Sequence, residues 1–159
     1  MADQPHHAHS DHKPPTSLNR LALSATLHCL TGCGIGEVLG LVIGTSLGWG
    51  TVATIALAVV LAFFFGYAMT LRPLLRSGMP IGRAMRVALA ADTVSITVME
   101  IIDNAVILII PGAMSAGLSS WVFWASLAFA LIVAAIVVFP VNRWMIARGR
   151  GHAVVHAHH

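Results

Sequence analysis

Four polar side chains near the start of the chain have the chemistry of metal ligands, although they lie in an apolar stretch. Cys29, Cys33 and Glu37 are spaced four residues apart, so they share one face of a helix, and His28 lies about 100° around that helix from Cys29. Thiolate, imidazole and carboxylate groups bind transition metals, and thiolates favour Cu(I) and Zn(II). The alternative is that the cysteines act as small apolar residues and that His28 hydrogen-bonds a neighbouring helix.

A disulfide between Cys29 and Cys33 is not expected. Helical residues four apart keep their Cβ atoms about 5–6 Å apart, whereas a disulfide needs about 3.5–4.5 Å. The spacing also differs from the C-x-x-C pattern of thioredoxin-like sites.

A second polar group lies in another apolar stretch further along the chain. On a helix Ser95, Met99 and Asp103 lie within about 60° of Asp92, and Glu100 lies about 80° away. A carboxylate that faces lipid costs about 2.5–3.5 kcal/mol even on a permissive scale. These acids should therefore face protein, water or a cation, and the alternative to a cation site is a hydrogen-bonded polar seam between helices.

The composition identifies the elements that must position these groups. Of 159 residues 57% are hydrophobic and only 9% are charged, against roughly 25% charged in a soluble domain. Apolar stretches at about 21–49, 52–71, 87–110 and 122–141 each contain the roughly 20 residues that a membrane span needs. We therefore predict an all-α integral membrane four-helix bundle at 18–148, with disordered tails at 1–17 and 149–159, and no nucleic-acid partner.

The basic residues predict the orientation of this bundle in the lipid bilayer. They gather near both tails and between the second and third stretches, as Lys13, Arg20, Arg72, Arg76, Arg83, Arg86, Arg143, Arg148 and Arg150. By the positive-inside rule both termini are cytoplasmic. Residues 1–20 lack the apolar core of a signal peptide, so we expect a multi-pass protein of the bacterial inner membrane.

Glycines recur at every fourth position of the first stretch and predict a closely packed helix face. They are Gly32, Gly36, Gly40, Gly44 and Gly48. Such a face permits close approach of another span or of the same span in a second subunit, as in G-x-x-x-G pairs. We expect helix packing and a homo-oligomer built through this face; a groove that conducts water or ions is the alternative.

The first and third spans run in the same direction across the membrane, which suggests a parallel repeat of two hairpins. An offset of 63 residues pairs Glu37 with Glu100 and Cys29 with Asp92. Transporters built from such repeats place their sites at the repeat interface near the midplane. This predicts that Glu37 and Glu100 approach the same cavity.

Both tails are rich in histidine, which suggests metal capture. The residues are His6, His7, His9 and His12 in the first tail and His152, His156, His158 and His159 in the second. Dense histidine tracts bind Zn, Ni or Cu. The alternative is a solvated tail with no specific role.

The segment 27–40, LHCLTGCGIGEVLG, resembles the hallmark of an uncharacterised bacterial family of small integral membrane proteins, a domain of unknown function. The family's pattern is H-C-x-x-G-C followed by G-x-x-x-G and an acidic residue, and the match uses His28, Cys29, Gly32, Cys33, Gly36, Glu37 and Gly40. The resemblance in length and in an acidic third span covers roughly 18–148. It implies an intact membrane domain but no activity.

These observations lead to one functional hypothesis, transport or channel-like passage of a transition-metal cation such as Cu(I), Zn(II) or Fe(II). The expected ligands are His28, Cys29, Cys33, Glu37, Asp92, Met99, Glu100 and Asp103, with Cu or Zn as the favoured metal. A first alternative is a metal sensor, chaperone or assembly factor that does not transport and serves a larger membrane partner. A second is a membrane thiol or metal oxidoreductase; no motif for hydrolysis or nucleotide chemistry is present.

Overall fold

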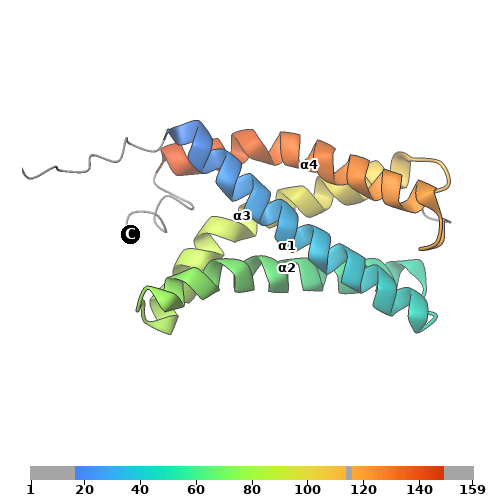
Figure 1. The fold of residues 1–159 in the computed structure, drawn as a ribbon, viewed down its shortest axis with the longest axis horizontal. Coiled ribbons are helices and arrows are strands. Elements are labelled where there is room, and N and C mark those ends of the chain that lie inside the picture. The colour runs from blue at the N-terminus through green and yellow to red at the C-terminus, as the bar shows by residue number, and fades with distance from the viewer. Residues whose placement is uncertain (1–16, 114–115, 149–159) are drawn as a thin grey trace, which may run out of the picture.

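A computed structural model describes residues 17–113 and 116–148, and four long helices fill most of this part of the chain (Figure 1). They are α1 (Leu18–Ser46), α2 (Thr51–Arg76), α3 (Ile81–Ile109) and α4 (Trp121–Ala147). No strand occurs within the described residues. The predicted all-α four-helix fold is confirmed, whereas both predicted tails with their histidines lie almost entirely outside the described residues.

Three of these helices, α1, α2 and α4, are long and apolar enough to cross a membrane. α3 is as long as α1, at 29 residues, but its arginines and acids lower its hydropathy. The helices also extend beyond the predicted stretches into polar residues, because backbone hydrogen bonding continues where hydropathy falls. α2 reaches Arg76, and α3 already includes Arg83.

The end of α1 corrects one prediction about the glycine series. The helix ends at Ser46, and Gly48 follows with a φ of +67°. This left-handed conformation suits a glycine that turns the chain toward α2. A Cβ added at Gly48 would meet nothing within 4 Å, so Gly48 is not part of the packed face.

α1 and α3 cross each other in the bundle, with α2 and α4 along its two sides (Figure 1). The first half of α1 packs on the end of α4, where Ala22 and Ala25 meet Ile146. The start of α3 packs on the end of α2 through Ala84 and Leu74. The middle of α1 therefore meets the middle of α3 at the crossing.

The tightest helix contact lies between α1 and α2 and uses the glycines of α1. An added Cβ at Gly32 would lie 2.9 Å from the Cα of Gly66, closer than real Cβ contacts allow. The next three glycines meet Ala62, Ala58 and Thr54 in turn, each with less than 3.0 Å for an added Cβ. The facing pairs are Gly32 and Gly66, Gly36 and Ala62, Gly40 and Ala58, and Gly44 and Thr54. Of the two predicted partners of this face, another span and the same span of a second subunit, the structure shows the first, because α2 of the same chain fills the face.

A buried polar network joins α1, α3 and α4, toward the end of the bundle where α1 begins. Asn142 of α4 accepts a hydrogen bond from the Ser95 hydroxyl of α3. Its Nδ2 atom donates to Oγ1 of Thr26 on α1 at 3.0 Å. All three side chains are buried, and the network therefore fixes the relative depth of three helices.

Replacing Asn142 with alanine should destabilise the bundle by about 1–2 kcal/mol, because two interhelical hydrogen bonds are lost and the hydroxyls of Thr26 and Ser95 keep only backbone acceptors on their own helices. Thermal unfolding in detergent measures this loss. Asn19→Ala is the matched control, since Asn19 bonds Arg143 at the exposed surface and its loss should change stability by about 0.5 kcal/mol or less. Equal stability of Asn142→Ala and Asn19→Ala would contradict a structural role for the network.

Candidate functional site

The four acids predicted within the spans all point into the bundle. Glu37, Asp92, Glu100 and Asp103 have exposed fractions of 4%, 3%, 5% and 1%. None of them faces the outer surface, where lipid would lie. Their burial follows from the helix faces, because α1 turns its polar face, and α3 its broad polar sector, toward the crossing.

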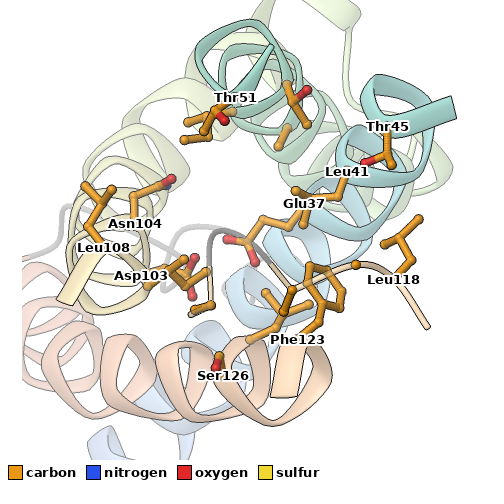
Figure 2. A pocket seen from close by; sticks show the side chains of 18 of the residues that line it. Glu37, Leu41, Thr45, Thr51, Asp103, Asn104, Leu108, Leu118, Phe123 and Ser126 are labelled. Carbon is orange, nitrogen blue, oxygen red and sulfur yellow. The ribbon is translucent and has the colours of Figure 1, made fainter. Parts of the chain in front are cut away.

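Glu37 and Asp103 form a carboxyl pair at the crossing. Figure 2 shows their carboxyl groups pointing toward one another from α1 and α3. They are close enough for direct electrostatic interaction, and Glu37 also interacts with the more distant Glu100. Two acidic groups that face each other repel when both are ionised, so the pair favours a bound cation or a shared proton.

This carboxyl pair lines a cavity of about 290 Å³ that extends to the connections α1–α2 and α3–α4 (Figure 2). All four helices contribute to its wall. Most of the wall is apolar, and its polar groups include the hydroxyls of Thr45, Thr51 and Ser126 and the amide of Asn104. The cavity thus connects one end of the bundle with the carboxyl pair.

The carboxyl oxygens at this site lack hydrogen-bond donors. Both oxygens of Glu37, both of Glu100 and Oδ1 of Asp103 are buried without a hydrogen-bond partner in the described structure. A buried polar group left unsatisfied costs about 1–3 kcal/mol, and a charged one costs more. These oxygen atoms are therefore an unused set of acceptors that a cation, a proton or water would satisfy.

Glu100 lies next to Cys33 and does not line the cavity. Cys33 belongs to a buried apolar cluster with Cys29 and Met99. Glu37 interacts with Glu100, as predicted, but the prediction that both approach the same cavity is wrong, because Asp103 and not Glu100 lines the cavity with Glu37. The sulfur side chains of Cys29, Cys33 and Met99 thus form a separate cluster, which precedes the carboxyl pair along both α1 and α3.

Two predicted ligands lie apart from these groups. His28 turns toward α2, where its Nε2 atom is 2.9 Å from Oγ1 of Thr70. Asp92 is eleven residues before Asp103 on α3, about 16 Å along the axis at 1.5 Å per residue, and it does not line the cavity. Within the described residues no three His, Cys, Asp or Glu side chains converge as a metal-binding group. The eight predicted ligands therefore do not form one site.

Sequence reasoning missed the partner face of α2 and the network of Asn142. The α2 face had a readable signal, since Thr54, Ala58, Ala62, Gly66 and Thr70 are small residues at intervals of four. Asn142 was also visible as an amide at the end of an apolar stretch. The wall residues from the connections, such as Ala113 and Leu118, carry no signal, because their position depends on how the chain folds over the bundle end.

Residues 19–151 match the family described as Domain of unknown function (DUF4396), and the chain belongs to that family. This agrees with the resemblance to an uncharacterised family that the first stretch suggested. No curated protein and no solved structure matches the chain significantly.

Proposed function

We propose that this member of an uncharacterised family binds a transition-metal cation inside the membrane and passes it through the bundle. One observation carries the proposal. The carboxyl groups of Glu37 and Asp103 meet at the inner end of a cavity, and three of their four oxygens are buried without a hydrogen-bond partner.

A cation explains these groups better than a structural seam does. In a seam the acids would accept hydrogen bonds from neighbouring helices, as Asn142 does from Ser95. The neighbours of Glu37 and Glu100 are instead another acid, Asp103, and a thiol, Cys33. Ionisable groups at membrane depth are costly, and they are retained mainly where they bind or move ions.

The positions of the cavity, the carboxyl pair and Cys33 suggest an order in which a cation would bind to them. It would enter through the cavity, reach the oxygens of Glu37 and Asp103, and then reach Glu100 and Cys33. Carboxylates suit Zn(II) and Fe(II), and the thiol suits Cu(I) or Zn(II). His28 and Asp92 would act only at a later stage, since they lie outside the cavity.

We further propose that α3 is the fourth membrane span. Its acids face inward, whereas Val94 and Ile101 on the same helix are exposed and apolar. By the positive-inside rule the arginines would lie on the cytoplasmic side of a bacterial inner membrane, with both termini. The cavity would then open on the opposite, periplasmic side of the inner membrane.

A second candidate function is metal binding without transport. It is favoured by the packed cluster below the cavity, in which Cys33, Ile96 and Val138 are buried and close the bundle. In this case the protein would hold a metal for a larger membrane partner. A homo-oligomer stays compatible with either function, but it would need a surface other than the glycine face.

Reconstituted vesicles separate the two functions. Wild-type protein should carry Zn(II) or Cu(I) into vesicles that contain a metal-sensitive dye, and Asp103→Asn should reduce the rate to that of protein-free vesicles, because one of the two charges is removed. Thr31→Val is the control, since its hydroxyl lies on the exposed side of α1 and bonds only the Leu27 carbonyl. Metal binding with no flux would favour the second function, and flux that survives in Asp103→Asn would refute the proposed path.

A further inference from the structure

We propose that the cation is Cu(I) and that the sulfur atoms of Cys29, Cys33 and Met99 hold it below the carboxyl pair. This inference rests on the proposed function, because it names the ion and its second binding position. The geometry that carries it is the meeting of three sulfur side chains from two crossing helices in one buried cluster.

The three sulfur side chains are almost completely buried. Cys29, Cys33 and Met99 have exposed fractions of 3%, 0% and 0%. The two cysteines are free thiols and are close enough to interact with each other. They come from successive turns of α1, and Met99 comes from α3 across the crossing.

The surroundings of this sulfur set suit a soft ion of low charge. Its walls are Ala62 of α2, Ile96 of α3, and Ala134 and Val138 of α4, all apolar. Apart from the carboxyl group of Glu100, these neighbours offer no oxygen ligands, whereas hard divalent cations require several. Thiolates and thioethers select Cu(I), and one positive charge costs less to bury than two.

Glu100 supplies the second, independent observation. Glu100 is only 5% exposed, and the described residue placed to interact with its carboxyl group is Cys33, a weak donor. When the Cys33 thiol is deprotonated, the thiolate and the neighbouring carboxylate repel each other, and a cation bound between them would relieve this repulsion. Glu100 interacts with both the carboxyl pair and Cys33, so it lies between the oxygen ligands at the cavity and the sulfur ligands of the cluster.

Anaerobic titration of the purified full-length protein with Cu(I), against a chromophoric Cu(I) chelator, tests this assignment. Ag(I) serves as a second probe that does not change its oxidation state. Cys29→Ser and Cys33→Ser should each weaken the tightest site by about 10–100-fold, since even outer groups around a metal contribute that much. Met99→Leu should weaken it less, because a thioether is a neutral ligand. Met145→Leu is the matched control, as Met145 is also a buried methionine but lies near the end of α4.

X-ray absorption of the loaded protein gives a direct signature. Sulfur neighbours that are lost in the cysteine variants would support the assignment, and a signal from nitrogen neighbours alone would place Cu(I) on histidines and overturn it. Tight Cu(I) binding unchanged in the double variant Cys29→Ser/Cys33→Ser would also overturn it. Zinc flux with no sulfur-bound Cu(I) would refute this inference and leave the proposed function intact, whereas sulfur-bound Cu(I) with no flux of any metal would do the reverse.

Discussion

Replacing Gly36 with alanine should separate α1 from α2 and lower the free energy of unfolding by about 3 kcal/mol, near the upper end of overpacking costs. An added Cβ would overlap the backbone of Leu61 and Ala62. Backbone atoms cannot rotate away as a long side chain can, so one helix must move. Thermal unfolding in detergent, followed by circular dichroism, measures the effect.

Gly34 provides a control two residues away on the same helix. A Cβ at Gly34 would lie 3.6 Å from Cδ1 of Leu131, an ordinary van der Waals contact. Alanine is favoured over glycine in a helix by up to about 1 kcal/mol. Gly34→Ala should thus be neutral or stabilising, while Gly36→Ala is strongly destabilising.

The same pair of variants tests where the glycine face lies. If the face joined two copies of the chain and not α1 to α2, Gly36→Ala would dissociate an oligomer without unfolding the protomer. Size-exclusion chromatography of the variant would then show a smaller particle with unchanged helicity. That outcome would restore the predicted subunit interface and contradict the packing of α1 on α2.

The fold was predictable because the chain divides its polar and apolar residues by helix and by helix face. Four apolar stretches gave four helices, and the inward position of Asp92, Glu100 and Asp103 followed from their shared sector on α3. The predicted ends were wrong by several residues, since hydropathy falls before a helix stops. The end of α1 differs in the other direction: the apolar stretch runs to about 49, whereas the helix ends at Ser46, so Gly48 continues the spacing of four but lies beyond the last turn.

The depth of the site was less predictable than its faces. The offset of 63 residues equals the difference between the first residues of α1 and α3, Leu18 and Ile81. The observed neighbours, Glu37 with Asp103 and Cys33 with Glu100, have offsets of 66 and 67. The difference is about one helical turn of 3.6 residues. A shift of one turn keeps each residue on its helix face but changes its partner on the other helix. The shift arises from the way α1 and α3 cross, and this crossing depends on side-chain packing that a hydropathy pattern does not contain.

The partners of His28 and of the cysteines also required the structure. His28 is adjacent to Cys29 in sequence, yet a step of about 100° turns it from the crossing toward Thr70 of α2. Sequence reasoning could place His28 and Cys29 on different faces. It could not say which face meets α3, because that depends on the packing of the glycines against α2.

Replacing Glu37 with methionine should stabilise the fold while it abolishes cation passage. The carboxyl group of Glu37 is buried with neither oxygen hydrogen-bonded, so its removal relieves about 1–3 kcal/mol of unsatisfied polarity. Methionine has a similar length and fills the same space with an apolar side chain. For a chain of this size each kcal/mol raises the unfolding temperature by about 2–4 °C. Thermal unfolding and vesicle flux measured on the same preparation check both parts.

The opposite signs of these two effects distinguish a functional acid from a structural one. A carboxyl group that held helices together would lower both stability and flux when it was lost, as Asn142→Ala is expected to lower stability. A carboxyl group kept for a cation lowers flux alone, because its burial costs free energy until the cation is bound. Addition of the transported metal should therefore raise the unfolding temperature of the wild-type protein but not that of Glu37→Met. If Glu37→Met unfolds at a lower temperature than wild type and still carries metal, Glu37 supports the fold and the cavity must bind its cation elsewhere.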